Sequence, residues 1–66
     1  MKLTINGQER DFADIQNARE LVENLGLINK PIAIELNYKI LPKQKLETTK
    51  LSDGDKLEIV SFVGGG

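Results

Sequence analysis

The 66-residue sequence predicts a small α+β domain in which one main helix packs across one face of a mixed sheet of four or five strands. Three observations lead to this prediction. Short segments of alternating apolar and polar residues occur near both ends of the chain and in its middle, as in half-buried strands. One stretch, residues 18–25, instead repeats its apolar residues with helical spacing. Turn signals separate the segments.

The first two strands are expected to form a hairpin. Residues 2–6 alternate between outward polar and inward apolar side chains. Asn6-Gly7 then favours a type I′ turn, because both central residues of that turn need positive φ. The return strand, residues 8–12, is polar until Phe12, which we expect to anchor it in the core.

The helix is expected to follow directly. Asn17 is a favourable N-cap, and Glu20 stands where a capping-box partner would be. Gly26 can end the helix in the left-handed conformation. The residues of the apolar stripe are Ala18, Leu21, Val22 and Leu25. A helix with one such stripe is expected to lie across a sheet.

The second half of the chain supplies the other strands. Pro31 opens a strand in which Ile32, Ile34 and Leu36 point to one face. A turn at 37–39 leads to a short strand at 40–41, which Pro42 ends. The further expected elements are a polar connection with one helical turn at 43–50, a core anchor at Leu51, a tight turn at 53–55 and a last strand at 56–62.

This order of elements predicts a β-grasp, or ubiquitin-like, fold. Two hairpins flank one helix, and the first and last strands can pair in parallel at the centre of the sheet. We expect residues 1–62 to form the β-grasp domain and residues 63–66 to form a flexible, glycine-rich C-terminal tail.

Composition excludes several classes of function. The sequence has no cysteine and no histidine, which removes thiol chemistry and the commonest metal ligand and general base. Nine basic against ten acidic residues give a net charge of -1, which argues against nucleic-acid binding. No apolar run is long enough to span a membrane. We expect a soluble, cytoplasmic protein that is monomeric when free and is not itself an enzyme.

The last strand and the tail carry the candidate site. Val60 and Phe62 point away from the face that covers the helix, so they could form an apolar docking patch together with Val63. They could instead only cover neighbouring side chains. Gly64 and Gly65 would thread a narrow channel, and the α-carboxylate of Gly66 would be the reactive group. The alternative for the glycine run is a disordered end.

Two further groups of charged residues are better explained without a function. Asp53 and Asp55 suit turn chemistry, and with no other ligand in the pattern we predict no metal site. Five lysines could steer an acidic partner, but a solvated surface is the favoured interpretation. They are Lys39, Lys43, Lys45, Lys50 and Lys56.

The whole chain resembles the ThiS family, the ubiquitin-like sulfur carrier proteins of thiamine biosynthesis. The similar segments are residues 5–7, 20–25, 34–37 with Pro42, 51–55 and 58–66. Residues 51–66 are the specific part, because the earlier segments alone would indicate only a ubiquitin-like fold.

The resemblance implies a function for the tail. An E1-like adenylyltransferase (ThiF-type) would use ATP to adenylate the Gly66 carboxylate, and no cofactor would be bound by this chain itself. A sulfur donor such as a cysteine desulfurase would supply sulfur to make a thiocarboxylate. That group would then pass to thiazole synthase (ThiG-type). The absence of cysteine fits sulfur held on the terminal carbonyl carbon.

Three alternatives stay open at this point. The small subunit of molybdopterin synthase resembles this fold and also ends in Gly-Gly, but it is typically longer and has prolines before its tail, whereas residues 60–63 contain none. The others are a ubiquitin-like modifier conjugated to lysines and a β-grasp interaction module with an incidental tail.

Overall fold

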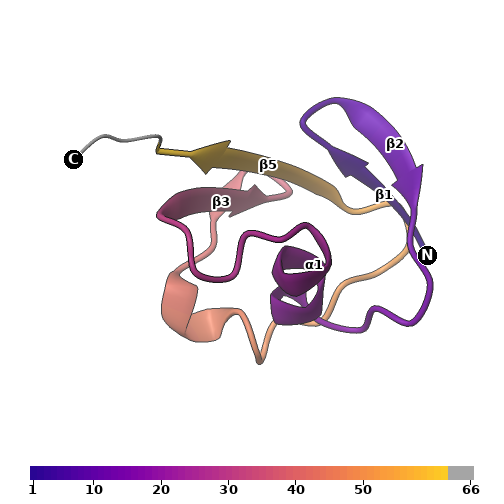
Figure 1. Cartoon of the computed structure of the whole chain (residues 1–66). Helices are drawn as coiled ribbons and strands as arrows, with labels where there is room; N and C mark the ends of the chain where they lie inside the picture. Colours follow the sequence, from indigo (N-terminus) through magenta and orange to yellow (C-terminus); the bar gives the residue numbers. More distant parts are fainter. Residues whose placement is uncertain (63–66) are drawn as a thin grey trace.

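The computed structural model describes residues 1–62, and the predicted tail at 63–66 lies outside the described residues. The described part folds as one sheet with a helix against one face (Figure 1). Its elements, in chain order, are β1 (Lys2–Ile5), β2 (Gln8–Asp11), α1 (Ala18–Asn24), β3 (Ile32–Leu36), β4 (Lys39–Ile40), a 3-10 turn (Lys43–Lys45) and β5 (Lys56–Ser61).

The sheet has the predicted mixed topology. Its five strands lie in the order β2-β1-β5-β3-β4. The central pair, β1 and β5, is parallel, and the other neighbours are antiparallel. The chain between β1 and β5 contains α1, which lies below the sheet in Figure 1. The predicted β-grasp arrangement, with first and last strands adjacent at the centre, is therefore confirmed.

Both hairpins turn through two residues with positive φ, as type I′ turns require. The first turn uses Asn6 (φ 50°) and Gly7 (φ 82°), and the second uses Asn37 (φ 50°) and Tyr38 (φ 69°). The prediction of a strand at residues 40–41 was wrong by one residue. Because the second turn needs only two residues, Lys39 already pairs with Leu36 and β4 is Lys39–Ile40.

Helix α1 begins and ends at the predicted residues. The Asn17 side chain accepts a hydrogen bond from the Glu20 N–H at 2.8 Å. The Glu20 carboxylate accepts from the Gln16 N–H at 2.7 Å, one residue before the N-cap, where a capping box would use the N-cap itself. Gly26 has φ +75°, the left-handed conformation expected just after the helix. The two hydrogen bonds cap the first turn of α1, and the conformation of Gly26 ends the helix.

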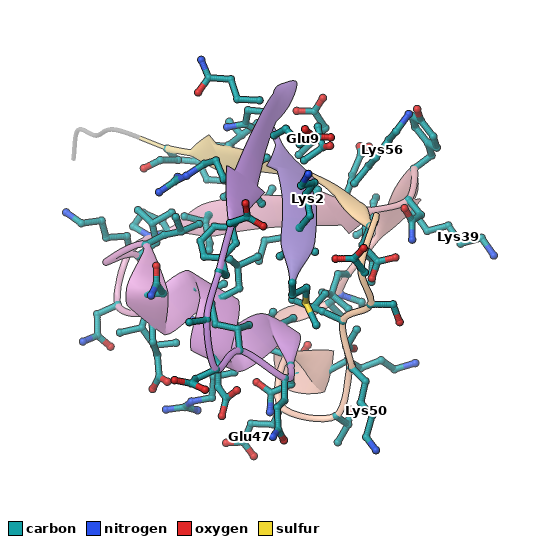
Figure 2. The ribbon with its side chains drawn as sticks, turned by 90° about the vertical axis from the view of Figure 1, so that its right-hand side faces the viewer. Lys2, Glu9, Lys39, Glu47, Lys50 and Lys56 are labelled. Atoms are coloured by element: carbon teal, nitrogen blue, oxygen red, sulfur yellow. The ribbon has the colours of Figure 1, made fainter. Side chains whose placement is uncertain are left out.

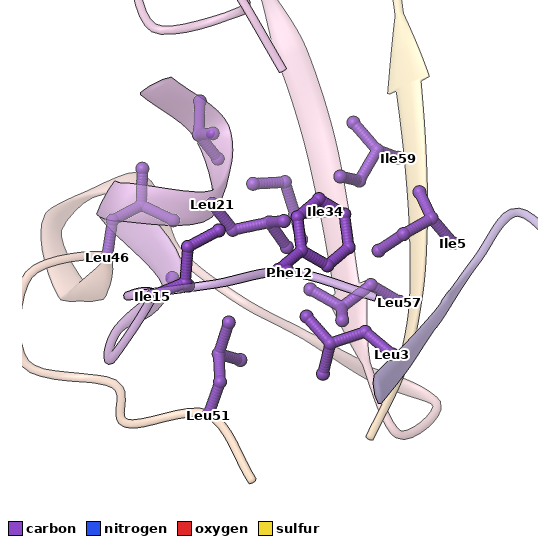
Figure 3. Packing of buried hydrophobic residues seen from close by; sticks show 12 residues of the cluster. Leu3, Ile5, Phe12, Ile15, Leu21, Ile34, Leu46, Leu51, Leu57 and Ile59 are labelled. Carbon is purple, nitrogen blue, oxygen red and sulfur yellow. The ribbon is translucent and has the colours of Figure 1, made fainter. Parts of the chain in front are cut away.

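The core lies between α1 and the sheet (Figure 3). Phe12 and Leu51, the two predicted anchors, are both 6% exposed. Ile15 and Leu46 are equally buried, although neither was predicted as a core residue. The buried hydrophobic residues are Leu3, Ile5, Phe12, Ile15, Ala18, Leu21, Val22, Ile34, Leu46, Leu51, Leu57 and Ile59.

Candidate functional site

Strand β5 divides its side chains between the two faces of the sheet, as the alternation predicts. Leu57 and Ile59 are buried against the core. Val60 is 56% exposed, and Phe62, the residue after the strand, is 57% exposed. More than half of each of these two apolar residues is therefore accessible to a partner, which is what a docking patch requires.

The register with β3 shows what surrounds this apolar pair. Val60 lies opposite Ala33, and Glu58 lies opposite Glu35. The Phe62 N–H donates to the Pro31 carbonyl oxygen at 2.9 Å, so the pairing continues to the last described residue. The open face is therefore apolar where β5 approaches the tail and acidic one pair of residues further back.

Two exposed apolar residues on the β3–β4 hairpin were not predicted as part of the candidate site. Ile40 is 80% exposed and lies opposite Glu35, and Tyr38 in the turn is 76% exposed. The sequence indicated only that Ile40 belongs to a short strand. It did not indicate the exposure of Ile40, because the face on which a strand residue lies depends on the length of the preceding turn. Ile40 therefore places an exposed apolar side chain on the edge strand, next to the acidic pair Glu35 and Glu58.

The aspartates after Leu51 have the predicted turn role. Asp53 accepts a hydrogen bond from the Lys2 N–H at 2.6 Å. Asp55 accepts from the Ser52 N–H at 2.8 Å and from the Asn37 side-chain amide at 3.0 Å. Both carboxylates are thus used to join the turn to neighbouring segments. Among the described residues, no group of three or more acidic, histidine or cysteine side chains could hold a metal ion.

The five lysines are exposed, in agreement with the solvated interpretation. Figure 2 shows Lys39 and Lys56 pointing outward near the sheet, whereas Lys50 lies at the bottom of the view, in the region of Glu47. Lys50 is therefore separate from Lys39 and Lys56. In residues 1–62, no helix is long and apolar enough to cross a membrane.

The remaining predicted site residues, Val63 and Gly64 to Gly66, lie outside the described residues. The structure thus places the two exposed apolar residues that precede them and leaves the predicted roles of the tail as predictions.

Comparison with known proteins decides the family. The ThiS family model matches residues 3–66, which is nearly the whole chain. The chain belongs to the ThiS family. The sulfur carrier protein ThiS of Bacillus subtilis (strain 168) is 35% identical over 65 residues, covering 97% of this chain and 98% of that protein. The match also supports the resemblance inferred from the sequence.

Other ThiS-related proteins extend this comparison. A solved structure, the thiamine biosynthesis protein ThiS from Geobacter metallireducens, superimposes with a TM-score of 0.82 at 32% identity, and the alignment covers all of both chains. A thiazole synthase of Paramagnetospirillum magneticum (strain ATCC 700264 / AMB-1) is 46% identical over 66 residues. This chain spans only 20% of the length of that protein. A ThiS-like segment therefore also occurs within a longer chain named as a synthase.

Proposed function

We propose that this chain is a sulfur carrier of thiamine biosynthesis, and that it is a protein co-substrate of partner enzymes. The observation that carries the proposal is the family match, which continues through the terminal glycines to residue 66. The exposed Val60 and Phe62 next to that segment support it, since a carrier must dock on its partners.

The proposed chemistry takes place at the Gly66 carboxylate. One carboxylate oxygen attacks the α-phosphorus of ATP on an E1-like, ThiF-type adenylyltransferase, and pyrophosphate leaves. The terminal sulfur of a persulfide, ultimately from a cysteine desulfurase, then attacks the acyl carbon and displaces AMP, which gives an acyl disulfide. A partner thiol cleaves the S–S bond by forming a disulfide with the donor's sulfur, and this two-electron reduction leaves the thiocarboxylate on Gly66. Thiazole synthase receives this sulfur, and the chain can be charged again. The partner supplies the ATP site.

The chain's own contribution is binding and access. Glycine lacks the Cβ that would crowd the approach of the carboxylate to the phosphate. Ordering a tail on a partner costs about 1–2 kcal/mol of backbone entropy per residue. Burial of the Val60 and Phe62 side chains can return about 1.5–3 kcal/mol each. In the proposal, docking of β5 offsets a large part of the cost of ordering residues 63–66.

Intact-mass measurement tests the proposed function. The chain is incubated with a ThiF-type adenylyltransferase, ATP, a persulfide sulfur source and a thiol reductant, with a second sample lacking ATP as the control. A mass gain equal to the exchange of one oxygen for sulfur, seen only with ATP, is the expected result.

An unchanged mass would contradict the carrier proposal. Attachment to lysines would indicate a ubiquitin-like modifier instead. Sulfur transfer that requires the large subunit of molybdopterin synthase, and does not occur with thiazole synthase, would favour the molybdopterin synthase small-subunit alternative.

The Phe62→Asp variant should lose partner affinity much more than stability. Phe62 is more than half exposed, so a charge there costs the fold little. It would remove an apolar contact worth about 1.5–3 kcal/mol, or roughly ten- to a hundredfold in Kd. Isothermal titration against the adenylyltransferase measures the affinity, and circular dichroism measures the melt.

The matched control is Ser61→Asp, which adds the same charge one residue away. Ser61 lies opposite Ile32, so its side chain belongs to the other face of β5. We expect this control to keep most of the affinity. Equal affinity of wild type and Phe62→Asp, or equal loss in both variants, would exclude a side-chain-specific docking patch.

A further inference from the structure

The two hairpin turns carry the same residue type at the same position, and both side chains reach β5. Asn6 and Asn37 each occupy the first of the two central positions of a type I′ turn, and each has φ 50°. Asparagine tolerates this conformation, as does glycine, so turn geometry alone does not explain the side-chain contacts. Those contacts differ in where they hold β5.

Asn6 extends the β1–β5 pairing beyond the end of β1. Its backbone N–H donates to the Leu57 carbonyl oxygen at 2.9 Å. Its side chain then makes two bonds to Ile59: the Nδ2–H donates to the carbonyl oxygen at 3.0 Å, and Oδ1 accepts from the N–H at 2.7 Å. This donor–acceptor pair is the pattern that a further strand residue would present to β5.

The Ile59 contact is the last one described on this edge of β5. The β1–β5 register ends with Ile5 opposite Leu57, and Asn6 adds Ile59. For residues 60–62, the described backbone partners come from the β3 side, through Ala33, Ile32 and Pro31. Asn6 therefore holds β5 directly before the segment that presents Val60 and Phe62.

Asn37 makes a comparable pair of contacts at the opposite end of β5. Its Oδ1 accepts from the Lys56 N–H at 3.0 Å, and its Nδ2–H donates to Asp55 at 3.0 Å. These bonds fix the beginning of the strand, four residues before Val60. Substitution of one asparagine or the other can therefore compare the loss of side-chain contacts at Ile59 with the loss of such contacts at Lys56.

We propose that Asn6 is a positioning residue for docking, which acts through Ile59 to keep residues 60–62 in the conformation that the activating partner binds. This inference rests on the proposed carrier function. When only a fraction of molecules presents the segment correctly, the apparent dissociation constant rises by the inverse of that fraction. Once the complex has formed, the partner itself holds the segment. Loss of the two hydrogen bonds between Asn6 and Ile59 should therefore raise KM and leave kcat unchanged.

The test compares Asn6→Gly with Asn37→Gly. Glycine keeps the positive φ of each turn and removes only the side chain, so both variants should fold. Each substitution removes two hydrogen bonds, both to backbone groups for Asn6 and one to the Asp55 carboxylate for Asn37. For Asn6→Gly we expect KM for adenylation to rise by about tenfold. Asn37→Gly should show a similar fall in melting temperature with wild-type KM. Pyrophosphate release with the ThiF-type enzyme gives KM and kcat.

Amide hydrogen exchange on the free chain supplies a readout that does not depend on activity. Asn6→Gly should accelerate exchange at Ile59, whereas Asn37→Gly should accelerate it at Lys56. Unchanged exchange at Ile59, or equal KM values for the two variants, would overturn the positioning role while wild-type adenylation still supports the carrier function. A wild-type chain that is not adenylated would overturn the carrier function and this inference together.

Discussion

Removal of Gly66 is expected to abolish adenylation by the partner and to leave the thermal melt unchanged. The variant would end at Gly65, so its carboxylate would stand about 3.5 Å short of the reacting position when the domain is docked. A misplacement of only about 1 Å can cost a hundredfold in rate. The buried core residues of the described chain lie between Leu3 and Ile59, so we expect the deletion to leave the core intact.

A substitution that preserves chain length separates the position of the terminal carboxylate from the width of the segment before it. Gly65→Trp keeps the carboxylate at residue 66 but adds a bulky side chain to the predicted threading segment, and we expect it to abolish adenylation as well. Pyrophosphate release measures the reaction, and circular dichroism measures the melt. Either variant losing its cooperative melt would show that the tail is structural. Normal adenylation of the deletion variant would exclude Gly66 as the reacting group.

The features predicted correctly from sequence are those set by neighbouring residues. The positive φ of Asn6 and Gly7, the Asn17 cap and the left-handed Gly26 all follow from local backbone chemistry. The exposed Val60 also follows, because alternation within one strand decides its face once Leu57 and Ile59 are placed in the core.

Features that depend on distant partners could not be predicted in this way. Ile15 and Leu46 stand in irregular, largely polar stretches, and only the folded chain brings them against α1 and the sheet. The hydrogen bonds between Asn6 and Ile59 join residues 53 positions apart, so no sequence spacing indicates them. Local pattern therefore predicted the exposed apolar residues proposed for docking, but not the contact that we propose positions them.

The Leu21→Ala variant should show the largest loss of stability among single substitutions in α1. Leu21 is fully buried, and replacing such a leucine by alanine typically costs about 2–5 kcal/mol through lost burial and the cavity left behind. A domain of this size has a free energy of unfolding of roughly 3–10 kcal/mol in all. The variant should therefore lose a large part of its margin, and its melting temperature should fall by about 10–30 °C.

Asn24→Ala in the same helix is the matched control, because residue 24 is exposed and alanine favours a helix. Urea and thermal unfolding measure both variants, and a Leu21→Ala melt close to that of the control would contradict the assigned core. The carboxylate proposed to react, on Gly66, is 45 residues from Leu21 in the sequence, so folded Leu21→Ala molecules should be adenylated normally. The adenylation rate should then follow the folded fraction as temperature rises, whereas removal of Gly66 should suppress it in fully folded protein. The Leu21→Ala rate thus depends on how much of the domain is folded, whereas the Gly66 deletion should lower the rate without unfolding. The comparison separates the contribution of the folded domain from that of the carboxylate that is proposed to react.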